Sequence, residues 1–569
     1  MSRLTFPLLL LSLPVLAFSG TISGHVFMDA NGDGQYQAAE PPVAGALVSD
    51  GIAITAPGAD GGYQLQSPDG LQVVFVVNPS GTWPTAGFYR VLPTGAGQAD
   101  FPLARQEQKL PFYFVHGTDL HIYDTAAGQM AQYVKALNEL PVSLAFVVHT
   151  GDLAVDTTGC QLSEGERRLK LYRQMVSGLK TPLFNLPGNH EHAGVANAGV
   201  APTEPDWGKG LYRRLFGPTY YAFNYAGIGF IAMDGTDVST GKLVYGIPKE
   251  CMDWLRAYLQ RLDLATPLVF AIHEPFFSLG PQKAEVEQML QGRKVIVALS
   301  GHGHEVARQP FAGGTEVEGG AVSYAWHGGP FPPNAMGYHL VKITGEGFED
   351  AFGDWAEQYP VTVISPARAT ILKDQAPCEV RFLDLKNEVT SVEVSLGDTT
   401  QTVTELKPVG LSRSFTCALS FPDLADGVYD LTLTLHGQGD AMVERQPFLF
   451  LTGKEEPFEA VAPAKLNMRL YGVNAADIVR VNGEEIGKLP ADAKEAQLLD
   501  LEVPARLLQR LNTVEFISAP LADGSYDDFS ALYVTLTYQG KKVSDPRVIG
   551  VVLPKSDKAE TRSMYFDIK

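Results

Sequence analysis

The spacing of apolar residues divides the chain into three stretches with different periodicity. From about Thr21 to Leu103, short apolar runs alternate with clusters of Gly, Pro and Asp, a pattern that predicts a small β-domain. Between Leu110 and about Phe352, apolar runs alternate with stretches whose apolar residues recur every three or four positions. After about Tyr359 the helical periodicity nearly vanishes, and the alternating runs predict further β-structure.

The middle stretch predicts an α/β layered domain, because strand-like and helix-like segments follow one another in turn. The predicted helices are residues 128–140, 164–179, 250–262 and 282–290. The predicted strands are residues 112–115, 144–148, 183–186, 230–233, 268–272 and 295–299.

These patterns predict a multidomain protein, since 569 residues exceed what one hydrophobic core usually covers. The central α/β domain is expected at 110–355, after an N-terminal β-sandwich at 20–105. Charge and proline interrupt the strand rhythm at Gly453-Lys-Glu-Glu-Pro457, which indicates a linker. We therefore expect a β-sandwich at 358–455 and a jelly-roll-like β-domain at 456–569.

The first residues have the pattern of a secretory leader. A short basic start precedes a mostly apolar run from Leu4 to Phe18 that Pro7 and Pro14 interrupt, and small residues follow it. A spanning helix needs about 20 apolar residues without such breaks, and no later stretch is long and apolar enough. The sequence therefore predicts a leader at 1–19 and a periplasmic or secreted protein.

The formal charge of −20 and the pI near 5.0 argue against nucleic acid or an anionic membrane as a partner, because both select basic surfaces. A phosphate substrate would meet the same repulsion unless local cations dominate its site. Four cysteines are compatible with export: the nearest pairings are Cys160 with Cys251 and Cys378 with Cys417, and four free thiols are the alternative.

Five short polar clusters lie in the middle stretch, and nearly all follow a predicted strand. Ligands bind beyond the carboxyl ends of strands in layered α/β domains, so these clusters are expected to converge. Carboxylate and imidazole groups suit first-row divalent ions, and a two-metal hydrolytic site needs one bridging carboxylate. The clusters are Asp119-Leu-His121, Gly151-Asp152, Gly188-Asn189-His190-Glu191, His273 and Gly301-His302-Gly303-His304.

The order of these clusters resembles the calcineurin-like metallophosphoesterase superfamily, whose pattern is Asp-x-His, Gly-Asp, Gly-Asn-His-Asp/Glu, His and Gly-His-x-His. The resemblance covers roughly Leu110 to Phe352, and the whole chain is similar to exported bacterial members with added β-domains. It implies two divalent metal ions, Mn, Fe or Zn, and attack by a hydroxide that bridges them. One ion would be held by Asp119, His121, Asp152 and His304, and the other by Asp152, Asn189, His273 and His302.

His190 is not a ligand in the family pattern, and its place beside Asn189 makes it the candidate catalytic acid. Asp156 is a candidate to orient it. Purple acid phosphatases, a branch of the superfamily, have a Tyr ligand three residues after the bridging Asp. That position is Val155 here, so a ferric-tyrosinate centre is not expected.

The remaining histidines of this stretch have no role in the family pattern, and packing or surface positions are the default expectation for them. They are His116, His149, His192, His327 and His339. Of these, His192 and His327 are candidates to line the mouth of the substrate site.

An acidic loop in the N-terminal β-domain matches the EF-hand pattern of oxygen donors. Its flanks read as strands rather than helices, so the sequence favours a calcium loop on a β-domain over an EF-hand, and an ion-free turn is the alternative. The candidate calcium ligands are Asp29, Asn31, Asp33 and Glu40.

Taken together, these features predict an exported dinuclear metal-dependent phosphoesterase that hydrolyses a phosphate monoester or diester. The alternative is an exported protein whose β-domains bind glycan or cell wall, with the metal site secondary. The segments Val481-Asn-Gly-Glu-Glu-Ile-Gly-Lys and Leu511-Asn-Thr-Val-Glu-Phe look like parts of jelly-roll ligand-binding modules. A complete ligand set favours the enzyme.

Overall fold

The computed structural model describes residues 18–68, 70–93, 97–197, 199–323, 336–355, 361–366, 370–373, 375–397, 399–420, 424–437, 442–493 and 497–569. The predicted leader therefore lies almost wholly outside the described residues, and so does His327. The chain forms two compact units. The first contains the described residues up to Ser323 together with Tyr338–Phe348, and the second contains Glu349–Lys569.

The first unit begins with a small β-domain of two sheets. Alternating buried and exposed residues in β4 show how a period-two sequence places one face of a strand on a core. One sheet has the order β4 (Gly62–Pro68), β1 (Phe18–Met28), β9 (Phe101–Arg105) and β6 (Thr82–Pro84), with β8 (Gly97–Gln98) paired to β1. The other has the order β3 (Ile54–Thr55), β2 (Leu47–Ser49), β5 (Gln72–Val77) and β7 (Tyr89–Leu92).

The middle of the chain forms two further sheets, in which parallel strands carry buried apolar runs on both faces. The first sheet contains β12 (Leu183–Asn185), β11 (Leu144–His149), β10 (Phe112–Gly117) and β21 (Tyr338–Ile343), and β22 (Phe348–Gly353) follows β21 in the chain. The second contains β13 (Tyr221–Tyr225), β14 (Ile228–Ala232), β17 (Leu268–Ala271), β18 (Val295–Ser300), β20 (Gly314–Glu318) and β19 (Ala307–Phe311). A short hairpin joins β15 (Thr236–Asp237) to β16 (Val244–Tyr245).

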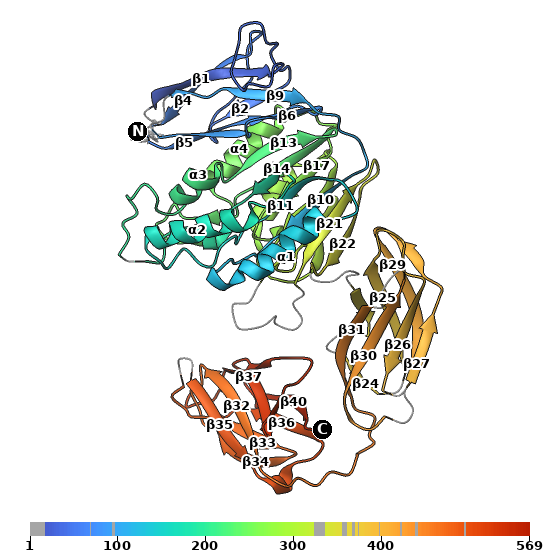
Figure 1. The fold of residues 1–569 in the computed structure, drawn as a ribbon. Helices are drawn as coiled ribbons and strands as arrows, with labels where there is room; N and C mark the ends of the chain where they lie inside the picture. The colour runs from blue at the N-terminus through green and yellow to red at the C-terminus, as the bar shows by residue number, and fades with distance from the viewer. Residues whose placement is uncertain are drawn as a thin grey trace, which may run out of the picture. The chain divides into compact units, whose positions relative to one another are not determined.

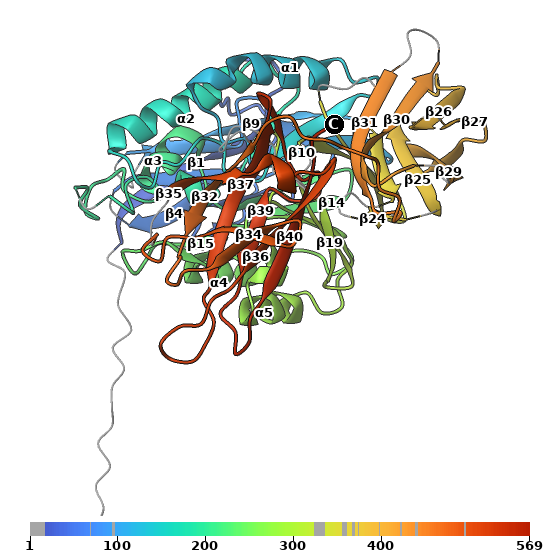
Figure 2. The same cartoon turned by 90° about the horizontal axis from the view of Figure 1, so that it is seen from below.

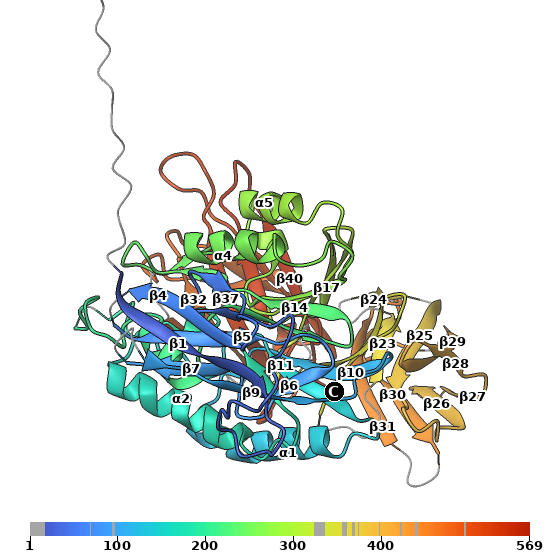
Figure 3. The same cartoon turned by 90° about the horizontal axis from the view of Figure 1, so that it is seen from above.

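Amphipathic helices lie on both sides of these strands. Helices α1 (Ala127–Asn138) and α2 (Leu162–Val176) lie on one side, and α4 (Lys249–Leu259) and α5 (Pro281–Met289) lie on the other (Figure 2, Figure 3). In α4 the buried residues Met252, Leu255 and Leu259 recur at helical spacing, as the sequence predicted. Short elements complete the domain: α3 (Gly210–Phe216), η1 (Asp124–Ala126), η2 (Asn189–Glu191) and η3 (Phe276–Ser278).

The structure confirms the layered α/β expectation, and each predicted strand and helix has a counterpart within a few residues. The sequence did not predict β21 and α3, nor the hairpin of β19 and β20. In β19 the residues between Ala307 and Phe311 are exposed, so this edge strand has almost no apolar pattern. The strands also divide between two sheets, which the periodicity of one chain segment does not reveal.

The small β-domain has a core of its own between its two sheets, and one of its faces also packs into the core of the α/β domain. Ile54, Phe75 and Val77 from the β-domain belong to the same buried cluster as the residues of both central sheets. Trp83 reaches into the same cluster, with its ring centroid 5.8 Å from that of Phe184. One face of the N-terminal β-domain is therefore packed against the α/β domain.

The second unit is β-rich throughout its described residues (Figure 1), in which η4 (Ala505–Leu507) is the one helical turn. Two sheets lie around a first core. One has the order β23 (Val361–Ser365), β25 (Gln375–Leu383), β29 (Ser412–Ser420) and β28 (Lys407–Val409). The other has the order β24 (Ile371–Leu372), β31 (Met442–Phe450), β30 (Gly427–His436), β26 (Ser391–Leu396) and β27 (Thr399–Val403). Two more sheets lie around a second core. One has the order β35 (Gln497–Val503), β32 (Ala464–Tyr471), β37 (Phe529–Tyr538) and β38 (Lys541–Val543), with β39 (Gly550–Leu553) paired to β37. The other has the order β34 (Glu484–Lys488), β33 (Ile478–Val481), β36 (Leu511–Ile517) and β40 (Thr561–Asp567).

All four cysteines are free thiols in the structure. Cys160 donates a hydrogen bond to the Thr157 carbonyl at 3.2 Å, while Cys251 is buried in α4. Cys378 and Cys417 occupy directly opposite positions of β25 and β29. Among the described residues, no helix combines the length and the apolar character that crossing a membrane requires.

Candidate metal centre

The predicted ligands lie at the carboxyl ends of parallel strands. Strands β10, β11 and β12 run parallel in one sheet, and β14, β17 and β18 run parallel in the other. Asp119 and Asp152 follow β10 and β11, and His273 follows β17. Because equivalent ends of parallel strands meet at one edge, residues far apart in the sequence reach the same place.

The backbone at this edge is held in an uncommon conformation. Five of the seven predicted ligands have a left-handed backbone: Asp119 (φ 53°), His121 (φ 41°), Asp152 (φ 49°), His302 (φ 73°) and His304 (φ 59°). Residues other than glycine rarely adopt positive φ, and such strain concentrates where function requires a set geometry. The concentration of strain here marks a functional site independently of any motif.

Two glycines of the motifs allow the loops after β11 and β12 to cross. A Cβ at Gly188 would lie 2.2 Å from Asp152 Oδ1, and one at Gly151, where φ is +100°, would lie 2.6 Å from the Gly188 nitrogen. Any side chain at either position would push the loops apart. The glycines therefore explain part of the sequence pattern by close backbone approach.

One group of donor atoms surrounds Asp119. Its Oδ1 lies 3.1 Å from His304 Nε2 and 3.6 Å from His121 Nε2, and these two nitrogens are 3.1 Å apart. The other oxygen, Oδ2, accepts hydrogen bonds from Thr118 Oγ1 at 2.7 Å and from the backbone nitrogen of His302 at 3.0 Å. One carboxylate oxygen is thus fixed by the protein, and the other faces the two imidazoles.

A second group of potential ligand atoms surrounds Asp152. Its Oδ1 lies 3.3 Å from His273 Nε2, and Asp152, His273 and His302 form one cluster of potential ligand atoms. Asn189 Oδ1 lies 3.0 Å from His302 Nδ1. His273 Nδ1 donates to the Thr150 carbonyl at 2.7 Å, so that Nε2 is left as the atom that can bind a metal.

Asp152 connects the two groups. While Oδ1 faces His273, Oδ2 lies 3.7 Å from His121 Nε2, so the carboxylate is close to both sets of imidazoles. The structure thus brings all seven predicted ligands together at one place. Their individual roles as ligands stay predictions.

The residues present fit divalent metal ions. Asp119 Oδ1 and His273 Nε2 are buried, have no well-formed hydrogen bond among the described residues, and lie 4.0 Å apart. Buried polar atoms normally have partners, so these two unpaired atoms indicate that cations complete the site. Carboxylate, imidazole and amide ligands together suit Mn, Fe(II) or Zn.

The site favours ionised carboxylates. Burial alone would raise the pKa of Asp152, but the surrounding histidines, with His273 foremost, hold that pKa below its usual value. The same balance of burial against His273, His121 and His304 holds the pKa of Asp119 well below its usual value. Both carboxylates are consequently available as anionic ligands at neutral pH.

The candidate acid His190 lies within this centre, and its ring forms one group of potential ligand atoms with His121 and Asp152. Its Nε2 lies 3.6 Å from Asp152 Oδ2, and its Nδ1 lies 3.9 Å from Asp156 Oδ1. Burial, more than any charge nearby, lowers the pKa of His190. The structure thus places Asp156 next to His190, although Asp156 Oδ1 also accepts bonds from the nitrogen and hydroxyl of Thr158.

Two buried glutamates that sequence reasoning left without a role hold the ligand loops. Glu191 accepts hydrogen bonds from the Leu153 nitrogen at 2.8 Å and from the Gly188 nitrogen at 2.8 Å, which ties the loop after β11 to the loop after β12. Glu318 accepts a bond from the Gly303 nitrogen at 2.9 Å. The sequence offered a signal for Glu191, because it is the last residue of the Gly-Asn-His-Glu motif. It offered no signal for Glu318, which lies outside every motif.

The histidines without a family role are buried wherever the structure describes them, as expected for packing residues. His149 is held between the hydroxyls of Tyr133 and Tyr172, and burial lowers its pKa to about 3. His192 is fully buried and contacts the Asn189 carbonyl, so the idea that it lines the substrate mouth is wrong. His116 and His339 stack with ring centroids 5.9 Å apart.

The N-terminal acidic loop lies between strands, not helices, because β1 precedes it and β2 follows it. Its acidic groups accept backbone hydrogen bonds: Asp29 from Gly32 and Gly34, and Glu40 from Ala30 and Gln37. These bonds give the loop a set shape without an ion. Calcium binding by this loop stays a prediction.

Comparison with known families places residues 112–306 under the model of the calcineurin-like phosphoesterases. Among curated proteins, the chain is similar to a "Probable glycerophosphodiester phosphodiesterase GpdQ" of Arcobacter nitrofigilis. The two are 26% identical over 175 residues, which cover 30% of this chain and 56% of the relative. The chain thus spans little more than half the length of that relative.

Solved structures give weaker likenesses. A phosphopantetheinyl hydrolase of Mycobacterium tuberculosis matches with a TM-score of 0.25 and 16% identity over 37% of this chain and 90% of that one. A cold-active protein-tyrosine phosphatase of a Shewanella species matches with a TM-score of 0.23 and 14% identity over 50% of this chain and 94% of that one. Similarity this low supports no conclusion about function.

Proposed function

We propose, from the premise that residues 112–306 form a calcineurin-like phosphoesterase domain, that the protein is an exported dinuclear metal-dependent hydrolase of phosphate esters. The observation that carries this proposal is the convergence of two groups of donor atoms on Asp152, one around Asp119 and one around His273. A shared carboxylate between two sets of imidazoles is the arrangement that a two-metal hydrolytic site requires.

The chemistry that two divalent cations supply when bound is polarisation of the phosphoryl oxygens and activation of water. The chain's own residues hold the reacting groups in place. Thr118 and the His302 nitrogen fix one oxygen of Asp119, and the Thr150 carbonyl fixes the ring of His273. Ligands fixed in this way lose little freedom when the substrate arrives.

We assign proton transfer to the leaving oxygen to His190, because its ring lies within the centre and the proposed ligand set does not include it. Asp156 is the positioning residue, since its carboxylate lies 3.9 Å from the far nitrogen of that ring. The departing alcohol then leaves as a neutral molecule instead of an alkoxide.

The substrate class is a phosphate monoester or diester, and the name of the curated relative makes a diester the first to test. We place the protein outside the cytoplasm on the strength of the apolar leader at 1–19. The flanking β-domains, each with two sheets around one core, are proposed to be sandwiches that support the catalytic domain.

The test is hydrolysis of bis-p-nitrophenyl phosphate and p-nitrophenyl phosphate by the full chain with added Mn, Zn or Fe(II). We expect turnover of at least one ester, and we expect chelation to abolish it. The Asp152→Ala variant should lose both the turnover and the bound metal. Asp557→Ala, which removes a carboxylate from an exposed bend, is the matched control and should behave as wild type. Turnover that survives both chelation and Asp152→Ala contradicts the proposal.

A second candidate function, glycan binding, is favoured by one feature of the C-terminal domain. A shallow cavity of about 590 Å³ on the sheet of β32 and β37 is lined by Asn467, Arg469, Asp500 and Tyr533. Tyr533 lies in a β-bulge with φ 53°, an uncommon backbone conformation for an aromatic residue. Pull-down of the full chain on peptidoglycan, chitin and cellulose tests it, and equal retention of Tyr533→Ala argues against it.

A further inference from the structure

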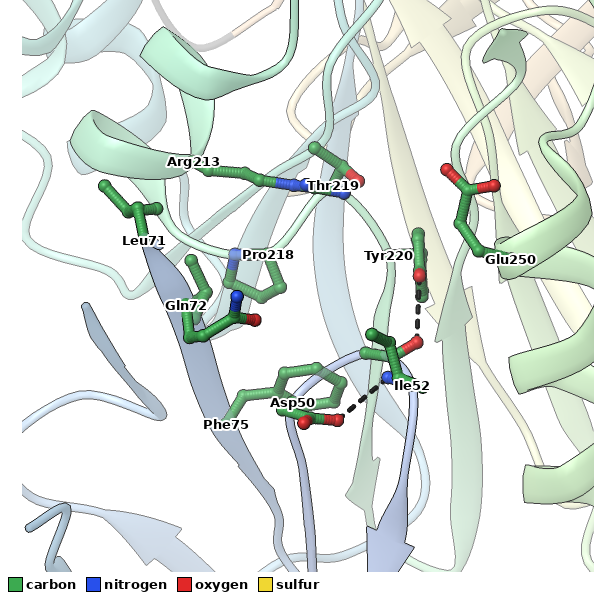
Figure 4. Close-up of a pocket in the computed structure, with 12 residues that line it drawn as sticks. Asp50, Ile52, Leu71, Gln72, Phe75, Arg213, Pro218, Thr219, Tyr220 and Glu250 are labelled. Carbon is green, nitrogen blue, oxygen red and sulfur yellow. Dashed lines mark hydrogen bonds between the residues drawn. The ribbon is translucent and has the colours of Figure 1, made fainter. Parts of the chain in front are cut away.

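A second cavity lies between the N-terminal β-domain and the α/β domain (Figure 4), apart from the predicted metal ligands. Its volume is about 240 Å³, enough for a small organic molecule. The turn after β2 and strand β5 form one wall, and the segment that joins α3 to β13 forms the other. No predicted catalytic or metal-binding residue lines it.

The wall from the β-domain is held rigidly against the α/β domain. Tyr220 donates a hydrogen bond from its hydroxyl to the Gly51 carbonyl at 2.9 Å. Ser49 Oγ accepts a bond from the Trp254 indole at 3.1 Å and donates to the Ala53 carbonyl at 2.7 Å. The cavity is therefore preformed, and a ligand that binds there does not have to order the turn.

Two residues that line this cavity each have a buried polar atom without a hydrogen-bond partner among the described residues. Asp50 is 8% exposed, and its Oδ1 accepts bonds from the nitrogens of Ile52 and Ala53, whereas its Oδ2 has no hydrogen-bond partner among the described residues. Thr219 is 2% exposed, and its hydroxyl likewise lacks a partner there. Buried polar atoms are rarely left unpaired, so these two indicate a ligand that completes them.

The charges around the cavity are of both signs. Arg213 extends along one side beside Thr219, while Asp50 lies on the opposite side, as Figure 4 shows. No ion pair joins Arg213 or Glu250 to another charged group among the described residues. The rings of Phe75 and Tyr220 supply an apolar surface between these charges.

This arrangement selects a particular ligand chemistry. A guanidinium binds carboxylates and other oxyanions well, and an unpaired carboxylate oxygen binds an ammonium group. A neutral sugar would leave the opposed charges without counter-charges inside a half-enclosed site. A small zwitterion satisfies both ends at once, with an apolar side chain against the two rings.

We propose that this cavity is a binding site for a free α-amino acid with an apolar side chain. Its carboxylate contacts Arg213 and Thr219, and its ammonium group contacts Asp50 and Glu250. Because the cavity has walls from both domains, occupancy fastens the β-domain to the α/β domain. The proposal concerns binding alone and does not rest on phosphoesterase activity.

The first experiment is a thermal-shift measurement of the full chain with each of the twenty proteinogenic L-amino acids at millimolar concentration, followed by calorimetric titration. We expect saturable binding of at least one apolar amino acid, such as leucine. Isoamylamine and 4-methylpentanoate, which carry only one of the two charges of leucine, should bind at least tenfold more weakly. Glucose serves as the neutral probe and should not bind.

Substitutions then locate the site. Arg213→Gln, Asp50→Asn and the exposed-rim change Glu250→Gln should each weaken the affinity at least tenfold, whereas Arg105→Gln, a matched change at an exposed arginine away from the cavity, should not. Absence of binding by all twenty amino acids overturns the proposal. So does binding that Arg213→Gln and Glu250→Gln both leave intact, or equal binding of glucose.

Discussion

At the scale of single residues, the ligands of the candidate centre are distinguished by backbone strain as much as by side-chain chemistry. Five of them hold positive φ values that their side chains disfavour. Hydrogen bonds around them explain how the strain persists. The backbone nitrogen of His121 donates to the Asp152 carbonyl at 2.8 Å, and the backbone nitrogen of Asp119 donates to the Gly151 carbonyl at 3.1 Å. The two acidic loops thus stabilise each other.

His190→Ala separates the candidate acid from the ligands. We expect metal content to stay unchanged, because the proposed ligand set does not include His190. We expect kcat to fall by about 10² to 10⁴-fold, as for a lost general acid. The loss should be smaller for p-nitrophenolate, a good leaving group, than for an alkyl ester. Metal analysis checks the first expectation, and kcat with a p-nitrophenyl ester and with an alkyl ester checks the second. Loss of metal equal to that in Asp152→Ala would reject the assignment.

The residue scale also shows what a sequence can and cannot reveal about this site. The convergence of the seven predicted ligands was predictable because nearly all of their clusters follow an apolar run in a fixed motif order. Glu318 and the Thr150 carbonyl were not, because their partners are a backbone nitrogen and a histidine from distant segments. Such supporting contacts depend on how the loops meet, and no local pattern records that meeting.

At the scale of secondary-structure elements, Glu191 is the connection between the loops after β11 and β12. It is fully buried and accepts bonds from three backbone nitrogens, those of Leu153, Ala154 and Gly188. A glutamine has only one acceptor oxygen, and its amide group would face a donor.

Glu191→Gln should therefore weaken metal affinity by about 10 to 100-fold, the usual range when a residue that supports a ligand is lost. The chain should remain folded. Metal titration of the variant, with exposed Glu204→Gln as the matched control, checks the effect. Unchanged affinity would show that the two loops keep their positions without this link.

A carboxyl in the C-terminal domain predicts a pH-dependent stability. Asp477 lies just before β33 and is fully buried, and this burial, with Asp527 adding to it, raises the pKa of Asp477 to about 7. The folded state therefore binds more protons than the unfolded state between about pH 4 and pH 7. Its stability is greatest at the acidic end of that window and falls as pH rises through the folded pKa.

The fall amounts to at most about 4 kcal/mol across the window. Asp477→Asn should flatten it and raise the melting temperature of this domain at pH 8 but not at pH 4. Calorimetry of the full chain at both pH values checks the prediction. An equal pH dependence in the variant would assign the effect to other groups.

The strands and helices of the α/β domain were predictable because long apolar runs and helical spacing are local properties. The hairpin of β19 and β20 was not, because its outer strand is exposed and has no alternating apolar pattern. The division of the strands between two sheets escaped for another reason: pairing depends on which strands meet in space, and runs of similar apolar character do not specify their neighbours.

At the scale of the whole molecule, the N-terminal β-domain is not an independent appendage. A sequence reading separates it at about residue 105, because its periodicity differs from that of the next segment. The structure instead shows one buried cluster that includes Phe75 and Val77 of the β-domain and residues of both central sheets. A hydrophobic core shared between two patterns is visible only once the chain has folded.

Trp83 of β6 makes this shared core testable. Its ring lies among four aromatic rings of the α/β domain, with centroids 6.5 Å from Phe146, 5.8 Å from Phe184, 6.3 Å from Phe223 and 5.8 Å from Tyr225. Trp83→Ala should lower the free energy of unfolding by about 3 kcal/mol through the cavity it leaves, and Trp83→Phe should lower it less.

Because part of the core is common to both domains, the β-domain and the α/β domain should lose stability in a single transition. Loss of the proposed phosphoesterase activity on heating should follow it. Leu264→Ala, at a leucine 56% exposed on a loop of the same unit, is the control and should change little. Calorimetry and residual activity after heating measure the effect. If Trp83→Ala melted the β-domain in a separate early transition and left heat inactivation unchanged, the two domains would be stabilised independently, since the shared core would then contribute nothing to the catalytic half.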